Sequence, residues 1–450
     1  MARLRKGARP LWAFVASAAC MVMFPLVAAA ASPWTIVPSP NTSATEQNIL
    51  NATSCLSAGN CWAVGFYVSG SSNDQTLVEH DSGSGWTIDA TSQNTSTTED
   101  NALQGVTCLS ASDCWAVGYA CAGGTCPFGG SGVQETLAEH YNGSAWAIVA
   151  TPTIAGQDTQ LYGVSCVTSG DCWAVGITCN GGSCPGLGAT GTSQTLAEHW
   201  NGSAWSIVST PNVGTGEDNV LSGVTCTGAG NCWAVGYSCT GGTCPFGSGV
   251  QQTLIEHWNG TAWSTTASAD QTSTADNTLN SVSCANATDC WAAGYYKSGS
   301  NLQTLTEQNT GSGWNIVASP NTSSTQDNEF FGIACDATGD CAAVGFYCCN
   351  NSNAGQALIE TETGGAWVIA SGPSNSSSAS EFNQLAGVSC DSLGDCAAVG
   401  DYAKGNATFQ TLIEESTQPT TNVPEWPAGP ISGLGVGAAA LLAIWMRRRS

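Results

Sequence analysis

The sequence predicts an all-β fold, a seven-bladed β-propeller of four-stranded antiparallel blades. A segment of 51 to 60 residues recurs seven times along the 450-residue chain. Each copy contains four short strand-like runs separated by turn residues, which is typical of a propeller blade. A further strand-like run, residues 34–37, precedes the first copy, and the last copy lacks its counterpart. This N-terminal strand should therefore pair with the last repeat and close the ring, which removes an exposed sheet edge.

The first two strands of each repeat, here called A and B, surround a pair of cysteines. In the fourth repeat the pair consists of Cys226, which ends Gly-Val-Thr-Cys, and Cys232, which begins Cys-Trp-Ala-Val-Gly. The residues between them favour tight turns, and the flanks alternate small with β-branched or aromatic residues, as strands do. Two cysteines at the ends of a short hairpin loop are well placed for a cross-strand disulfide. We predict seven such bonds: Cys55–Cys61, Cys108–Cys114, Cys166–Cys172, Cys226–Cys232, Cys284–Cys290, Cys335–Cys341 and Cys390–Cys396.

The third and fourth strands, C and D, carry the motifs Gln-Thr-Leu-x-Glu and Trp-x-Ile-Val. In the third repeat these are residues 194–198 and 205–208, and Asn201-Gly202 stands between them. Asn-Gly between two strand-like runs is the strongest short-range signal for a hairpin. The glutamate of strand C recurs in all seven repeats, and a histidine follows it in four. Side chains repeated around a ring do not converge on one metal ion, so packing explains them better.

The two ends of the chain differ from the repeats. Residues 1–31 have four basic residues and then an apolar run that ends in alanines, which is typical of a secretory signal peptide. Residues 32–416 form the predicted propeller, and residues 417–428 form a Pro/Thr linker. Residues 429–446 are apolar and near the short limit for a transmembrane helix, and residues 447–450 are a basic cytoplasmic tail. We expect an exported protein that the C-terminal segment anchors at the cell surface, or that is released after processing.

The C-terminal tail resembles a known group of sorting signals. Val423-Pro424-Glu425-Trp426, the apolar segment and the arginine cluster are similar to the tripartite PEP-CTERM-type tails of bacteria and archaea. The resemblance covers the last 28 residues, and Trp426 stands where the family usually has proline. It implies recognition by a sorting transpeptidase in the membrane. A plain membrane anchor is the alternative.

The predicted secreted domain is strongly acidic. It holds 32 acidic residues, no arginine, and only Lys297 and Lys404 as basic residues, which gives a formal net charge of −30. Such a surface repels phosphate backbones, so nucleic acid is excluded as a partner. Sialidases clamp a substrate carboxylate with arginines, so that class is excluded too. An extracellular glycan or protein ligand, or a cation, fits the charge better.

Five repeats have an aspartate eight residues before the first cysteine. The residues, predicted to ring the mouth of the central channel, are Asp100, Asp158, Asp218, Asp276 and Asp327. One interpretation is that they cap the turn into strand A by bonding backbone groups. The functional alternative is a cation site, for which Ca²⁺ is the candidate because hard cations prefer carboxylate oxygens. No other cofactor is predicted.

Repeats two, three and four alone insert a second cysteine pair after strand B. The pairs are Cys121/Cys126, Cys179/Cys184 and Cys239/Cys244. In an oxidising compartment they predict disulfides and not zinc sites. Two of these stapled loops continue with an aromatic residue, Phe128 or Phe246. Three stapled loops on adjacent blades form a candidate recognition surface, and the alternative is that they are merely tolerated insertions.

Residues 32–416 as a whole resemble the secreted bacterial propellers built on Cys-Trp-Ala-Val-Gly repeats. That resemblance implies the fold and no particular activity. The repeats are nearly uniform, and no isolated catalytic constellation stands out among them. We therefore predict a non-catalytic binding or structural module. The alternative is an extracellular polysaccharide hydrolase or lyase, which would need paired carboxylates at the channel mouth.

Overall fold

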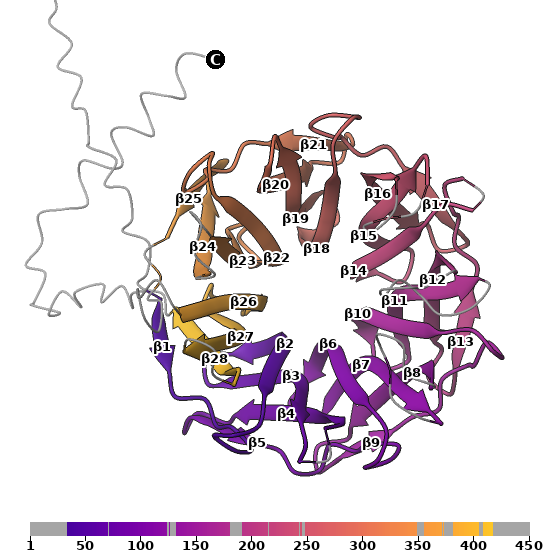
Figure 1. The fold of residues 1–450 in the computed structure, drawn as a ribbon, viewed down its shortest axis with the longest axis vertical. Coiled ribbons are helices and arrows are strands. Elements are labelled where there is room, and N and C mark those ends of the chain that lie inside the picture. The colour runs from indigo at the N-terminus through magenta and orange to yellow at the C-terminus, as the bar shows by residue number, and fades with distance from the viewer. Residues whose placement is uncertain are drawn as a thin grey trace, which may run out of the picture. The chain divides into compact units, whose positions relative to one another are not determined.

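A computed structural model describes residues 34–416 except 71, 124–125, 127–131, 181–190, 215, 243, 245–247, 349–354, 371, 373–380 and 405–407. Within these residues the chain forms 28 strands and no helix. The strands make seven four-stranded antiparallel sheets, arranged as the blades of a ring (Figure 1). The predicted seven-bladed β-propeller is confirmed.

Six blades run in chain order from strand A beside the central axis to strand D at the rim (Figure 1). Blade 1 consists of β2 (Asn48–Ser57), β3 (Asn60–Val68), β4 (Asp74–Asp81) and β5 (Trp86–Ile88). Blade 2 consists of β6 (Asn101–Ser110), β7 (Asp113–Ala122), β8 (Val133–Tyr141) and β9 (Trp146–Ile148). Blade 3 consists of β10 (Thr159–Thr168), β11 (Asp171–Asn180), β12 (Thr192–Trp200) and β13 (Trp205–Val208).

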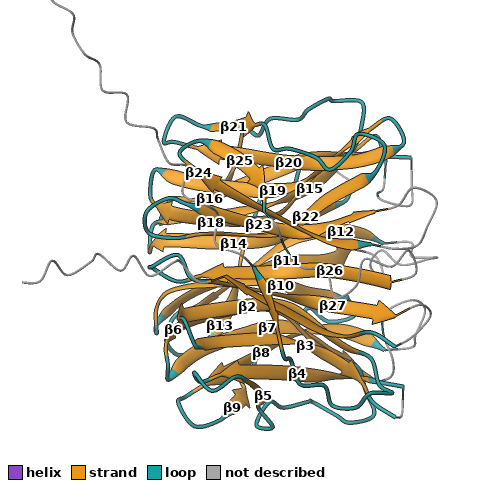
Figure 2. Cartoon of the chain, turned by 90° about the vertical axis from the view of Figure 1, so that its left-hand side faces the viewer, coloured by secondary structure: helices purple, strands orange, loops and turns teal. Residues whose placement is uncertain are grey.

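The next three blades repeat this arrangement. Blade 4 consists of β14 (Asn219–Gly228), β15 (Asn231–Thr240), β16 (Val250–Trp258) and β17 (Trp263–Thr266). Blade 5 consists of β18 (Asn277–Asn286), β19 (Asp289–Ser298), β20 (Asn301–Asn309) and β21 (Trp314–Val317). Blade 6 consists of β22 (Asp327–Cys335), β23 (Cys341–Cys348), β24 (Gln356–Thr363) and β25 (Ala366–Ile369). In the side view the hairpins gather on two opposite faces, because successive strands alternate in direction (Figure 2).

Blade 7 is assembled from both ends of the described chain. Its strands are β26 (Glu381–Cys390), β27 (Cys396–Lys404), β28 (Gln410–Ser416) and, at the rim, β1 (Thr35–Val37). Thr35 lies opposite Glu415 and Val37 opposite Ile413 in an antiparallel pair. Trp34, just before β1, is buried with 4% of its surface exposed. The predicted closure by the N-terminal strand is therefore confirmed.

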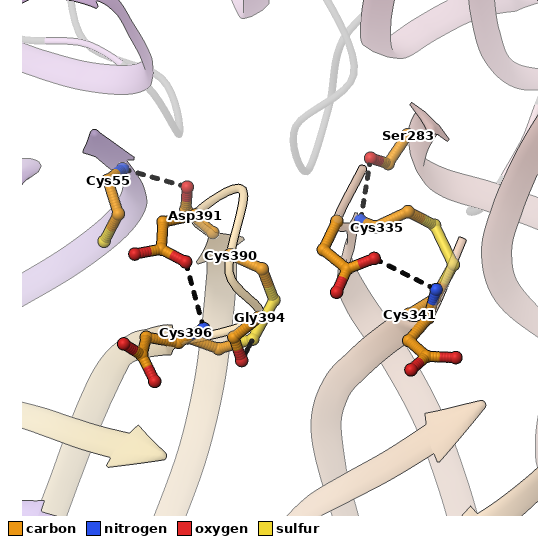
Figure 3. The surroundings of a disulfide bond; sticks show 12 residues. Cys55, Ser283, Cys335, Cys341, Cys390, Asp391, Gly394 and Cys396 are labelled. Atoms are coloured by element: carbon orange, nitrogen blue, oxygen red, sulfur yellow. Dashed lines mark hydrogen bonds between the residues drawn. A yellow bond between two sulfur atoms is a disulfide. The ribbon is translucent and has the colours of Figure 1, made fainter. Parts of the chain in front are cut away.

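The A–B hairpin of every blade carries its predicted disulfide. The two cysteines face each other directly in the ladder, as Cys166 and Cys172 do. In four blades the first cysteine also donates its backbone N–H to a serine hydroxyl of the preceding blade. The bond from Cys335 to Ser283 Oγ is 3.0 Å long (Figure 3). These hairpins are thus stapled within a blade and linked to the next one.

A close backbone approach explains the glycine that ends each strand-B motif. At Gly176 an added Cβ would lie 1.9 Å from the carbonyl oxygen of Gln160 on strand A. A bulge in strand A between Leu161 and Gly163 shapes this approach. A larger residue would collide with backbone and not with a movable side chain, so the motif requires glycine here.

The hydrophobic core lies between blades. Trp115 and Val117 of blade 2, for example, pack with Leu161 and Trp205 of blade 3. In blades 1 to 5 the strand-B tryptophan meets the strand-D tryptophan of the next blade edge-on, with ring centroids 5.2 to 5.5 Å apart. Because each blade buries its faces only against its neighbours, the chain is stable as a closed ring and not as separate repeats.

Several predicted features lie partly or wholly outside the described residues. The stapled-loop disulfides Cys121–Cys126 and Cys239–Cys244 are present, and Cys179 is disulfide-bonded. Cys184, Phe128 and Phe246 lie outside the described residues, as do the signal peptide 1–31, the linker 417–428, the helix 429–446 and the tail 447–450. In the part of the chain that is described, no helix is long and apolar enough to cross a membrane.

Candidate functional site

The central channel is narrow, and no charged side chain is among the described residues that line it. Its volume is about 170 Å³, and its wall is made by the A strands. The larger side chains in this wall are Asn51, Gln104, Tyr162, Ser222, Asn280 and Phe331. No carboxylate pair is among the described residues that line this cavity.

The five predicted aspartates bond backbone groups across blade boundaries. Each accepts a hydrogen bond from an N–H at the start of strand C in the preceding blade: Asp100 from Asp74, Asp158 from Gln134, Asp218 from Ser193, Asp276 from Gln251 and Asp327 from Leu302, at 2.7 to 3.0 Å. Asp100 and Asp218 are 4% and 2% exposed. Among the described residues no group of three or more His, Cys, Asp or Glu is placed to hold a metal ion. A Ca²⁺ site at these aspartates stays a prediction.

Two of these aspartates also hold a stapled loop. Asp100 Oδ2 accepts a hydrogen bond from the N–H of Cys126 at 2.8 Å, and Asp218 Oδ2 accepts one from Cys244 at 2.9 Å. Cys121 and Cys126 pack with Ala102 and Tyr119 of the same blade. The base of the loop is thus fixed to the scaffold, whereas the loop residues that were predicted to contact a ligand lie outside the described part.

A cavity of about 550 Å³ opens between blades 7 and 1, beside the A–B and C–D hairpins. We call it the seam cavity, because it lies where β1 and β28 close the ring. Its lining includes Trp86 and Asp81 of blade 1 and Ala397, Asp395 and Glu415 of blade 7. The volume falls within the range of roughly 300–1,000 Å³ that is usual for small-ligand sites.

The seam cavity lies where the repeat loses a tryptophan. The residue after the second cysteine of strand B is tryptophan in blades 1 to 5 but alanine, Ala342 and Ala397, in blades 6 and 7. In blade 2 this residue, Trp115, is 1% exposed and fills the space toward blade 3. In blade 7 only the methyl group of Ala397 occupies this place, so the volume of an indole ring is left open beside Trp86.

Two side chains that neighbour the strand-B tryptophan at other interfaces are also replaced at the seam. Opposite the strand-B tryptophan, strand C carries a histidine in blades 1 to 4, and the two rings lie 3.9 to 4.5 Å apart. In blade 7 Glu415 lies opposite Ala397. The second neighbour is the residue at the last ladder position of strand C in the next blade. At the first three interfaces it is aromatic: Tyr141, Trp200 or Trp258. At the seam it is Asp81. At the seam, carboxylates therefore occupy two positions that hold aromatic side chains at the first three interfaces.

The third neighbour, the strand-D tryptophan of the next blade, is present at the seam as Trp86 and hydrogen-bonds one of these carboxylates. The Trp86 Nε1–H donates to Glu415 Oε1 at 2.8 Å. Asp81 Oδ1 accepts hydrogen bonds from the N–H groups of Gly83 and Gly85 at 2.9 and 3.0 Å, which caps the C–D turn. Asp81 Oδ2 and Glu415 Oε2 accept no hydrogen bond from any described residue. No basic side chain is among the described residues that line the seam cavity.

The strand-C glutamates form a second unusual set, one at each blade interface. All seven side chains are completely buried: Glu79, Glu139, Glu198, Glu256, Glu307, Glu360 and Glu414. Burial raises the pKa of Glu198 and of Glu256 to about 8 and that of Glu360 to about 9. The pKa of Glu139 rises less, to about 7, because Ser92 and the N–H of Gln93 bond its carboxylate. Since the same glutamate recurs at every blade interface, packing accounts for the set better than catalysis does.

The predictions from sequence did not include the seam cavity, although the sequence carries a signal for it. The signal is the change from Cys-Trp-Ala to Cys-Ala-Ala in the last two repeats, together with Glu415 at the position where four repeats have histidine. The two halves of the site lie more than 300 residues apart, so the repeat alignment alone does not reveal that Asp81 and Glu415 line one space.

No protein-family model matches the chain, and no curated protein matches it. Solved structures that are similar include YCF48 bound to a D1 peptide, with 12% sequence identity and a TM-score of 0.48 over 86% of this chain and 97% of that one. A protein of unknown function from Dyadobacter fermentans DSM 18053 is 8% identical, with a TM-score of 0.49 over 86% of this chain and 99% of that one.

A third similar structure is an ulvan lyase of polysaccharide lyase family PL25, bound to -[GlcA(1-4)Rha3S]-. It is 11% identical, with a TM-score of 0.49 over 84% of this chain and 95% of that one. YCF48 is bound to a peptide and the ulvan lyase to a saccharide in these structures, and neither similarity decides the function of this chain. Its resemblance to Cys-Trp-Ala-Val-Gly propellers and to PEP-CTERM-type tails stays a prediction.

Proposed function

We propose that this protein is a non-catalytic binding module that is exported and displayed at the cell surface, and that its glycan or protein ligand enters the seam cavity. The observation that carries the proposal is the open space beside Ala397. Protein interiors are packed with few voids larger than a water molecule, and an unfilled cavity lowers stability. A ligand-sized space at the seam, lined by two anchored carboxylates, is therefore better explained by binding than by imperfect packing.

The carboxylates of the seam cavity suit the recognition of a ligand. Glu415 and Asp81 are each anchored to the scaffold through one oxygen, by Trp86 and by the C–D turn. The other oxygen of each is left to accept hydrogen bonds from a ligand, and the rigid scaffold lowers the entropy that binding would cost. Trp86 adds an aromatic surface, as binding sites commonly do.

The disulfides support the exported location in this proposal. Nine disulfides join described cysteines, and such bonds are typical of oxidising compartments. The proposal includes anchoring through residues 429–446 and, before it, recognition of the tail by a sorting transpeptidase. A protein that stays extracellular after export would keep its hairpin staples oxidised.

The test is a ligand screen with a variant that restores the repeat. The purified protein is applied to glycan and peptide arrays and to a panel of polysaccharides, beside Ala397→Trp, which places the indole of blades 1 to 5 in the seam cavity next to Trp86, Glu415 and Asp81. We expect ligand capture by the wild type, loss of capture by Ala397→Trp, and no turnover of any polymer. Ala342→Trp, the same change at the neighbouring interface, is the matched control. Capture that survives Ala397→Trp would contradict the proposal, and polymer turnover would support the hydrolase or lyase alternative.

A further inference from the structure

We infer that the seam cavity takes a guanidinium group, presented by an arginine side chain of a protein or peptide partner. The inference rests on the proposed function and adds the chemistry of the ligand. The other blade interfaces hold a planar ring at this place, whereas the seam holds two carboxylates around it.

Part of the seam cavity corresponds to the place that a flat indole ring occupies at the first five interfaces. At the interface of blades 2 and 3, Trp115 lies 4.5 Å from His140 and 4.8 Å from Trp200, measured between ring centroids. Trp205 meets it edge-on at 5.3 Å and 87°. At the seam the corresponding walls are Glu415, Asp81 and Trp86. A planar group therefore fits where the indole is missing.

The charge of the walls selects a cation. Both aromatic neighbours of the missing ring are replaced by carboxylates, and each of these has an oxygen that accepts no hydrogen bond from the described residues. A neutral ligand could donate hydrogen bonds to these oxygens but would leave the two negative charges, removed from water, without an opposite charge, which a cation supplies. The secreted domain has no arginine and only two lysines. The compensating cation should therefore come from a partner.

Guanidinium meets both requirements at once. It is planar, permanently charged and carries five N–H donors in a fork that matches carboxylate oxygens. It also stacks favourably on or beside an indole ring. An ammonium group is a compact, strongly hydrated charge, so it would pair with Glu415 or Asp81 but leave the flat space unfilled.

The interface of blades 6 and 7 serves as an internal comparison. There too the strand-B tryptophan is replaced, by Ala342. Its walls, however, are Thr361 and Ser416, which lie at the positions of Glu415 and Asp81. Loss of the tryptophan and gain of the two carboxylates thus coincide at the seam and not at its neighbour.

Calorimetric titration with three matched peptides tests the inference. The probes are acetyl-Gly-Arg-Gly-amide, the same peptide with citrulline, which is planar but uncharged, and the same peptide with lysine. We expect the arginine peptide to bind at least ~10-fold more tightly than either of the others, because the charge and the planar fork both contribute. Its affinity should fall as salt is raised.

Variants locate the binding and separate the two proposals. Glu415→Gln keeps an oxygen for the Trp86 N–H and should weaken the arginine peptide ~10-fold, while Ala397→Trp should abolish binding. Thermal melts verify that both variants fold. Equal affinity for arginine and citrulline, or no effect of Glu415→Gln, would overturn the inference. A neutral glycan that binds the wild type and is lost in Ala397→Trp would also overturn it but leave the proposed binding function intact.

Discussion

The interface of blades 2 and 3 and the interface of blades 7 and 1 share a backbone design but differ at the strand-B residue and at two of its neighbours. Trp115, His140 and Trp200 make the first a filled aromatic contact. At the same positions the second has Ala397, Glu415 and Asp81, and a cavity of about 550 Å³. A repeat protein can therefore gain a candidate site when one core side chain is lost and two of its neighbours change, without adding a loop.

The seam differs from the other interfaces in a second way, because it is also where the ring closes. Val37 of β1 and Glu415 and Ser416 of β28 line the cavity. The strand that completes blade 7 thus forms part of the wall. A ligand that contacts this wall and Trp86 of blade 1 would stabilise the closed ring by binding only the folded state.

The largest expected effect comes from breaking the seam itself. Deletion of residues 32–37 removes β1 and the buried Trp34 and exposes β28 as an open edge. Loss of the tryptophan alone should cost about 3–5 kcal/mol. We expect low yield, aggregation in size-exclusion chromatography and a lower melting temperature. The exposed Thr35 side chain offers the control, since Thr35→Ala should change little. A truncated protein that stays monomeric and equally stable would contradict the closure model.

Trp115→Ala should open a cavity at the interface of blades 2 and 3, at the place where the seam has Ala397. The substitution removes a side chain that is 1% exposed and packed against three rings, so the free energy of unfolding should fall by about 3–5 kcal/mol. Denaturant titration measures the loss. A decrease below about 1 kcal/mol would mean that the blades repack around the missing indole, and the seam cavity would then lose its significance.

The pH dependence of stability should reflect the buried glutamates that both kinds of interface contain. The folded-state pKa values of Glu79, Glu198, Glu256 and Glu414 are about 8, above the ordinary value of 4.5. Between these values the folded protein binds more protons than the unfolded chain, so stability falls as pH rises from about 4.5 to 8. Below that window these groups are protonated in both states and contribute no slope.

Melting temperatures recorded from pH 4 to pH 9 check this expectation. Glu198→Gln should flatten part of the slope, because the amide does not titrate and neither oxygen of Glu198 has a hydrogen-bond partner within 3.5 Å among the described residues. A melting temperature that rises from pH 5 to pH 8 would show that other groups dominate. Disulfide-intact protein must be used throughout, since reduction would change the stability independently.

The repeat pattern predicted the fold well because the residues that each hairpin and strand require recur in all seven repeats. The cysteine pairs predicted the A–B hairpins, and the unmatched strand at residues 34–37 predicted how the ring closes. The site was harder to predict because it depends on contacts between blades. Asp100 looked like a cap for its own turn, yet it bonds Asp74 of the preceding blade. Ala397 became informative only once the structure placed it beside Trp86.

The smallest expected effect is that of Ala397→Trp on stability. The added indole should occupy the part of the seam cavity beside Trp86 and meet that ring edge-on, as Trp115 meets Trp205, which contributes roughly 0.5–1.5 kcal/mol beyond burial. Against this, the ring would displace water from Glu415 and Asp81, and the loss of hydration of two carboxylates opposes the gain. We expect the free energy of unfolding to change by no more than about 1 kcal/mol, which denaturant titration resolves. A combined variant, Ala397→Trp with Glu415→His, rebuilds the stacked pair of blades 1 to 4 and should be more stable than the single variant. A double variant that is no more stable than Ala397→Trp would mean that Glu415 does not oppose the burial of an indole at the seam.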